Sequence, residues 1–255
     1  MNHFKLTLFL LLMLHAFSVK ADQTEQIFSH DLFQSVISQH VKDGFVDYPA
    51  IKKNTDYHAY ISTLKTASQF KNSIDELSYW INAYNALAIK GILDGRSPET
   101  FFGKIGYFYN AEYNVNGKII NLYDLEHDII IPLGEPRIHF ALNCASASCP
   151  KLNNAVYQAD KLEQQLEHAT SMFINDKSRN RFDLENKTAY LSKIFDWFED
   201  DFVKYSGTVQ NFIALYVTDK HVSNALANNE FQIEYLEYDW SLNGIPPSRV
   251  TEDQD

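Results

Sequence analysis

The amino-acid sequence predicts a single mixed α+β domain, in which helices of the N-terminal third pack on a mainly antiparallel sheet and further helices follow. Several segments carry apolar residues at helical spacing, and others alternate apolar and polar residues around turn signals. Of the 255 residues, 45% are hydrophobic, which is enough for a substantial core. The chain has no repeat, no Gly/Ser-rich linker and no abrupt change of composition. One domain over residues 22–245 is therefore the simplest organisation.

Residues 1–21 have the parts of a cleavable secretory signal. Lys5 gives a basic start, residues 6–17 are almost entirely apolar, and Ala21 ends the segment with a small residue at the cleavage position. The apolar run of about 12 residues is shorter than the roughly 20 that a membrane-spanning helix needs. We therefore expect a periplasmic or secreted protein without a stable membrane anchor after cleavage; a retained anchor is the alternative.

The composition makes nucleic acid an unsuitable partner. The chain has 33 acidic and 22 basic residues and a formal net charge of −11. Such a surface repels phosphate backbones, and no basic run or basic–aromatic stripe opposes this effect. The expected partner is a small-molecule or peptide substrate in the cell envelope. No cofactor is indicated, and the oligomeric state is left open by the sequence.

Periodicity and turn residues order the elements of the N-terminal half. The expected elements are a helix over 24–41 that ends at Asp43-Gly44, an extended piece at 45–48, a helix from Pro49 to about Leu64, a helix over 76–93 capped by Asp75, and a hairpin within 107–120. Asn116-Gly117, set between alternating apolar residues, is the signal for the hairpin.

The C-terminal half continues with alternating helices and strands. The expected elements are a helix over 122–131, a buried strand over 137–142, a helix over 159–175, a hairpin over 181–191, helices over 194–202 and 210–216, a strand over 231–238 and a disordered tail over 246–255. Asp200 and Asp201 are expected to form only a solvated helix face.

The densest group of chemistry-bearing residues is RIHFALNCASASCP, residues 137–150. Cys144 with His139 nearby is a nucleophile-and-base pairing, because the thiolate is the reactive form and an imidazolium lowers the thiol pKa. On a strand these two side chains point to opposite faces, so they meet only if the chain turns near Asn143. Asn143 and Glu126 are the candidates for the orienting or oxyanion group.

Other roles for these residues stay open. Cys144 and Cys149 are the only cysteines and can form a disulfide, but on an extended strand they would lie roughly 16 Å apart, so a bridge requires a turn between them. His139 can be a hydrogen-bonded core histidine. A metal site would use Glu126, His127, His139 and the cysteines, whose spacings match no common zinc motif.

Five more side chains form the expected substrate-binding set: Asn82, Asn85, His127, Ser146 and Lys193. Asn82 and Asn85 stand three apart on one face of an otherwise apolar helix. Buried amides need partners, because an unpaired one costs on the order of 1–3 kcal/mol. The two amides therefore either clamp the helix to a loop or line a cleft beside the cysteine loop. Lys193, among aromatic residues, is either a salt-bridged surface lysine or faces the same cleft.

Six segments together resemble the domain of unknown function 547 family: VKDGFVDYPAIKK, YWINAYNALAI, NLYDLEHDII, RIHFALNCASASCPKL, LSKIFDWFEDDF and EYDWSLN. The likeness runs from about Val41 to Asn243. It implies the family's Asn-Cys-Ala-Ser and Cys-Pro pattern at 143–146 and 149–150, its histidine at His139, and the export that is common among bacterial members. Family members often carry an arginine near the end of the Leu-Glu-His helix, a stretch that Ile130, Ile131 and Pro132 occupy here.

The leading hypothesis is a cysteine-dependent hydrolase or acyl-transfer enzyme acting on a peptide, amide or ester in the cell envelope. Cys144 would be the nucleophile, His139 the base, and Asn143 or Glu126 the orienting group. The rival hypothesis is a non-catalytic domain that binds a ligand or protein and has a structural Cys144–Cys149 pair; it is favoured by the high aromatic content. A distant likeness to papain-like architecture would agree with the first hypothesis, although no cysteine starts a helix as that architecture requires.

Overall fold

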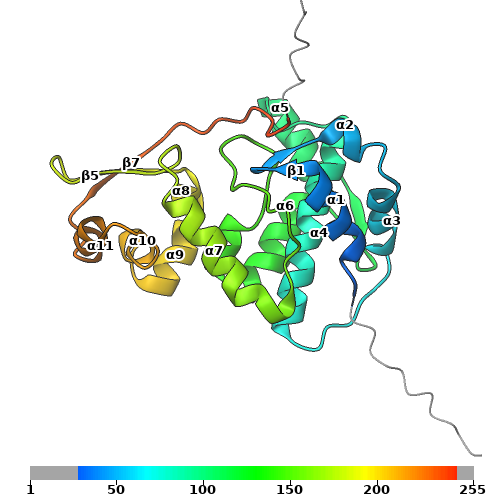
Figure 1. Cartoon of the computed structure of the whole chain (residues 1–255), viewed down its shortest axis with the longest axis horizontal. Coiled ribbons are helices and arrows are strands. Elements are labelled where there is room, and N and C mark those ends of the chain that lie inside the picture. The colour runs from blue at the N-terminus through cyan, green and yellow to red at the C-terminus, as the bar shows by residue number, and fades with distance from the viewer. Residues whose placement is uncertain (1–27, 246–255) are drawn as a thin grey trace, which may run out of the picture.

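Helix α4 (Ser73–Leu93) is the central element of the N-terminal half in the computed structural model, which describes residues 28–245 (Figure 1). Its sequence is apolar on nearly every face, so the helix is buried along most of its length. The side chain of Asn72 begins the helix by accepting hydrogen bonds from the backbone N–H groups of Ile74 and Asp75, both at 2.9 Å.

Short helices and two hairpins surround α4. Their bounds are α1 Asp31–His40, β1 Val41–Lys42, β2 Phe45–Val46, α2 Tyr48–Ile51, α3 Thr55–Thr63, α5 Phe101–Lys104, the π-helical segment η1 Ile105–Tyr109, β3 Tyr113–Val115 and β4 Lys118–Ile120. The hairpins turn at Asp43-Gly44 and Asn116-Gly117, where all four residues have positive φ, as a two-residue type I′ turn needs. The predicted hairpin is confirmed over β3 and β4.

The C-terminal half adds a third small sheet and more helices. Its elements are α6 Leu122–Asp124, the π-helical segment η2 Leu125–Ile130, the 3-10 helices η3 Ile131–Leu133, η4 Pro136–Phe140 and η5 Ala159–Lys161, then α7 Leu162–Ile174, β5 Arg181–Asp183, β6 Thr188–Leu191, α8 Ile194–Trp197, α9 Glu199–Ser206, α10 Val209–Ala214, α11 Lys220–Ala227 and β7 Gln232–Tyr235. Strand β6 pairs antiparallel with β5 and parallel with β7. The predicted mixed α+β class is confirmed, with three small sheets in place of one larger one.

Two hydrophobic cores lie side by side. The first surrounds α4, and the second is formed by α9, α10, α11 and the sheet β5-β6-β7, with α7 between the two regions (Figure 1). Phe140, at the end of η4, belongs to the second core, where its ring lies 5.0 Å from that of Phe173 and 5.6 Å from that of Phe195. Segment η4 therefore connects the two cores.

The chain returns to the first core after β7. Figure 1 shows this segment running from the second region back toward β1 and α2. The backbone N–H of Val46 donates to the carbonyl oxygen of Asn243 at 3.0 Å, and the N–H of Ile245 donates to the carbonyl of Val46 at 3.0 Å. The N–H of Asn243 also donates to the carbonyl of Ala145 at 3.0 Å. The C-terminal segment thus lies against both the first hairpin and the cysteine loop.

The prediction of a buried strand over 137–142 is wrong, because most of this segment belongs to the 3-10 helix η4. Pro136 fixes a helical φ at its start, and the Glu135 side chain accepts a hydrogen bond from the Arg137 N–H at 3.0 Å. The segment is buried throughout. Its short apolar run therefore could not show whether it forms a buried strand or a buried helix.

Other boundaries also differ from the expected ones. The helix expected over 49–64 is divided into α2 and α3, because the Asn54 side chain caps a new helix by accepting from Tyr57 N–H at 3.0 Å. The helix expected over 194–202 breaks at Phe198, between α8 and α9. Helix α11 was not anticipated, although its Asp219 cap and buried Val222 and Leu226 fit an amphipathic helix.

Two sequence predictions lie outside the described residues, namely the signal at 1–21 and the tail at 246–255. Within residues 28–245, no helix combines the length and the apolar character that a membrane-spanning segment needs.

The cap of α4 gives a direct test of the fold. Asn72→Ala is expected to lower the free energy of unfolding by about 1 kcal/mol, because two N–H groups lose their acceptor. Asp75→Ala changes the residue that the sequence indicated as the cap. It is expected to lower the free energy of unfolding by less, because the Asp75 side chain lies in the first turn and does not accept the capping hydrogen bonds. Urea unfolding of both variants measures the difference; a larger loss for Asp75→Ala would contradict the assignment of the cap.

Candidate functional site

Cys144 and Cys149 are joined by a disulfide that closes a short loop, with Cα atoms 6.0 Å apart. The turn that this bridge requires is present. Ala145 adopts a left-handed φ of 64°, and the N–H of Cys149 donates to the carbonyl of Ser146 at 3.2 Å. In this state neither cysteine carries a thiol. Neither opens a helix, since the loop follows η4 directly.

The two halves of the disulfide have different surroundings. Cys149 is 3% exposed, whereas Cys144 is partly exposed. The backbone N–H of Cys144 lies 2.8 Å from Cys149 Sγ and points toward it. Cys144 Sγ lies 3.2 Å from Ser146 Oγ and 3.3 Å from the hydroxyl of Tyr238. Tyr238, which follows β7, was not among the residues that the sequence singled out.

The buried side chain of Asn143 holds the start of this loop. Its Oδ1 accepts from the N–H of Ala145 at 3.1 Å and from the side-chain amide of Asn243 at 3.1 Å. Its Nδ2 donates to the carbonyl of Pro150 at 2.7 Å. Both the oxygen and the nitrogen of the Asn143 side chain are therefore occupied by hydrogen bonds that hold the loop. Asn143 is a positioning residue.

Asn82 and Asn85 connect α4 to two later segments. Asn85 accepts from the N–H of Asn143 at 2.8 Å and donates to the carbonyl of Ala141 at 2.9 Å. Asn82 pairs in the same two-bond manner with the backbone of Tyr157, at 2.9 and 2.8 Å. Both amides are buried and hold backbone, which is the clamp that the sequence analysis considered for them.

His139 forms a pair with an acid that lies far away in the sequence. Its Nε2 lies 2.8 Å from Oδ2 of Asp201, on α9, and its ring stacks on Phe198 with centroids 3.9 Å apart. The other ring nitrogen, Nδ1, is buried without a hydrogen-bond partner. Since a carboxylate accepts the Nε2 proton, Nδ1 carries the free lone pair of the neutral ring. Burial lowers the pKa of His139, so the ring is neutral at physiological pH.

Asp201 is thus a candidate functional residue that the sequence analysis placed on a solvated face. Its side chain is 30% exposed, and His139 lies 62 positions before it. No local pattern marks this aspartate, because the pairing depends on how α9 packs beside η4. Within the described residues, no hydrogen bond joins His139 to Cys144, so the structure does not bring these two predicted residues together in the oxidised state.

Glu126, in η2, is held by a phenol of α4. Its Oε2 accepts a hydrogen bond from the hydroxyl of Tyr84 at 3.2 Å. Burial raises the pKa of Glu126 to about 7, and the hydrogen bond from Tyr84 opposes the rise. Near neutral pH this carboxyl is therefore present in both the protonated and the ionised form.

The remaining predicted residues are held by near neighbours. His127 stacks on Tyr123 with centroids 3.9 Å apart, and its Nδ1 lies 3.0 Å from the carbonyl oxygen of Tyr123. Lys193 forms an ion pair with Asp196 at 2.9 Å and lies 5.1 Å from the ring centre of Tyr235. Among the described residues, no three His, Cys, Asp or Glu side chains are grouped to hold a metal ion.

The fold and site together define a mixed α+β domain with a disulfide-closed loop, a histidine–aspartate pair and a partly buried carboxyl. Residues 68–174 match the family model described as "Protein of unknown function, DUF547". The match covers α4, η2, η4 and the cysteine loop, so this part of the chain is similar to that family. No curated protein and no solved structure matched the chain.

The raised pKa of Glu126 predicts a pH-dependent stability. The ordinary pKa of a glutamate is 4.5, and that of Glu126 in the folded protein is about 7. At pH values between these two, the folded protein keeps a proton that the unfolded chain has lost. The free energy of unfolding should therefore fall as pH rises through this window, by on the order of 1–3 kcal/mol. Glu126→Gln should remove this part of the pH dependence in denaturant titrations between pH 4.5 and 8.

Tyr84→Phe is the matched control. Removing the hydrogen bond that favours the ionised carboxyl should raise the pKa of Glu126 further and steepen the loss of stability toward high pH. Identical pH profiles for the wild type and Glu126→Gln would contradict the assignment.

Proposed function

We propose that this protein is a cysteine-dependent hydrolase or acyl-transfer enzyme that acts on a peptide, amide or ester in the cell envelope. It would keep its nucleophile, Cys144, as a reducible disulfide with Cys149. The observation that most supports this proposal is the His139–Asp201 pair with its unpartnered Nδ1. A carboxylate-held imidazole with one free nitrogen is the arrangement by which nucleophilic enzymes activate a serine or cysteine.

The proposed reaction begins with reduction of the disulfide. A dithiol reductant supplies two electrons and two protons, so Cys144 and Cys149 become thiols and the reductant becomes a disulfide. His139 Nδ1 then takes the proton of Cys144, and the thiolate attacks the carbonyl carbon of the substrate. The C–N or C–O bond breaks, the leaving amine or alcohol takes the proton from His139, and the acyl group stays on sulfur. Water, or an acceptor amine or alcohol, then cleaves the thioester and restores the thiol.

The neighbouring groups have roles that follow from their contacts. The hydroxyls of Ser146 and Tyr238 lie within hydrogen-bond distance of Cys144 Sγ and would stabilise the thiolate. Glu126, protonated in part near neutral pH, would donate a hydrogen bond to the developing oxyanion. Asn143 and Asn85 act on the reaction only by fixing the loop.

A binding domain without catalysis is the second candidate, and a surface of aromatic residues favours it. Trp197 is 46% exposed, and its ring lies 4.7 Å from Tyr238 and 5.7 Å from Trp240. Lys104 lies 3.8 Å from the ring centre of Trp240. Aromatic rings of this kind supply large contact areas for ligands. In this alternative the disulfide is purely structural.

Single-cysteine variants distinguish the two candidates. Cys149→Ser leaves Cys144 as a permanent thiol, and we expect iodoacetamide to alkylate it at pH 7 roughly tenfold faster than in the same variant carrying Asp201→Asn, because the neutral imidazole that Asp201 orients would accept the thiol proton at Nδ1. In Cys144→Ser the remaining thiol is 3% exposed, so alkylation of the folded protein should be slow. Mass spectrometry of the alkylated protein measures each rate.

Asp201→Asn is preferred to a substitution of His139 because the Asp201 side chain is 30% exposed, whereas that of His139 is fully buried. Circular dichroism tests whether each variant is folded. The pH dependence of alkylation adds a readout that a structural role would not move. If Cys144 reacts at the rate of an ordinary exposed thiol, with or without Asp201, the enzyme proposal fails and the binding domain is favoured.

A further inference from the structure

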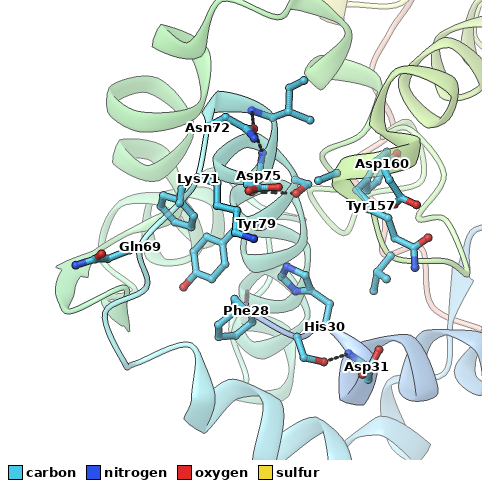
Figure 2. Close-up of a pocket in the computed structure, with 17 residues that line it drawn as sticks. Phe28, His30, Asp31, Gln69, Lys71, Asn72, Asp75, Tyr79, Tyr157 and Asp160 are labelled. Atoms are coloured by element: carbon cyan, nitrogen blue, oxygen red, sulfur yellow. Dashed lines mark hydrogen bonds between the residues drawn. The ribbon is translucent and has the colours of Figure 1, made fainter. Parts of the chain in front are cut away.

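A cavity of about 570 Å³ lies between the start of α1, the first turns of α4 and the segment that leads into η5 (Figure 2). None of Cys144, Cys149, His139, Asp201 and Glu126 lines it. Its size falls within the range of cavities that hold small molecules. The chemistry of its wall indicates what it can hold.

Aromatic rings form one part of the wall. Phe28 meets the ring of Tyr79 edge-on with centroids 4.9 Å apart, and the ring centroid of Phe70 lies 5.1 Å from that of Tyr79. Figure 2 shows Phe28, His30 and Tyr79 gathered at the same part of the cavity. Phe28 and Phe70 are only partly buried, so their rings are open to an occupant.

The charged groups of the wall are mainly acidic. Asp31, Asp75 and Asp160 line the cavity together with a single cation, Lys71. Within residues 28–245, none of these three carboxylates forms an ion pair. His30 adds no positive charge near neutral pH, because burial lowers its pKa to about 4. The local charge therefore favours a cation over an anion.

We propose that this cavity binds a small organic cation, an ammonium group carried on an apolar body. The aromatic rings would attract the cation through their faces and cover its apolar part, and the acidic side chains would neutralise its charge. A metal ion is the less suitable occupant, since no group of three ligating side chains converges among the described residues. The proposal is independent of the enzyme hypothesis.

Choline and its uncharged isostere, in which carbon replaces the nitrogen, form the matched pair of probes. We expect the full-length protein to bind choline saturably in calorimetric titrations, and the isostere roughly tenfold more weakly, because the two differ only in charge. Tryptophan fluorescence is a second readout, since Trp80 lies 5.0 Å from Tyr79. Equal binding of both probes, or no saturable binding of choline, would overturn the proposal.

Single substitutions locate the site. Asp75→Asn, Asp160→Asn and Phe70→Ala should each weaken choline binding by roughly threefold to tenfold. Glu185→Gln, which removes one negative charge from an exposed turn between β5 and β6, should leave binding unchanged and so controls for net charge. If Glu185→Gln weakens binding as much as Asp75→Asn does, the attraction is nonspecific and the cavity is not the site.

Discussion

The buried hydrogen bonds of Asn143 are the interactions on which the rest of the site depends. Asn143 lies at the meeting point of three segments. Its backbone N–H donates to Asn85 on α4, and its side-chain amide bonds to Ala145 and Pro150 in the cysteine loop and to Asn243 in the C-terminal segment. Each hydrogen bond is buried, so any group left without its partner would cost on the order of 1–3 kcal/mol. Because all the partners are needed at once, the loop has one geometry, and the position of Cys144 follows from it.

The irregular helices around this amide serve the same arrangement. Segment η4 has to place Phe140 in the second core and His139 against Phe198 and Asp201. Arg137 fixes its other side through two-pronged contacts with Glu135 and Glu163, at 2.7 to 2.8 Å. A regular strand would have turned neighbouring side chains to opposite faces of a sheet, and within residues 28–245 no strand pairs with this segment. Tertiary packing therefore decided the local structure.

This contrast explains how much the sequence could predict. The Asn116-Gly117 hairpin depends on two adjacent residues, and Asn82 and Asn85 share one helix face, so local spacing revealed the hairpin and the need for buried partners. The pairing of His139 with Asp201 depends on the docking of α9 beside η4, and Tyr238 reaches Cys144 only because the chain returns after β7. Neither contact has a local signature. The spacing of Cys144 and Cys149 alone left the disulfide undecided, because a turn was needed to bring the two cysteines together. The structure has this turn at Ala145.

The unequal burial of the two sulfurs determines which of them an external thiol can reach. Cys144 is the accessible half, so attack there would expel Cys149 as the leaving thiolate. A thiolate produced in a buried position is unfavourable unless it is hydrogen-bonded, and the N–H of Cys144 already points at Cys149 Sγ from 2.8 Å. The loop that the bridge closes therefore also supplies a donor for the sulfur that reduction would release.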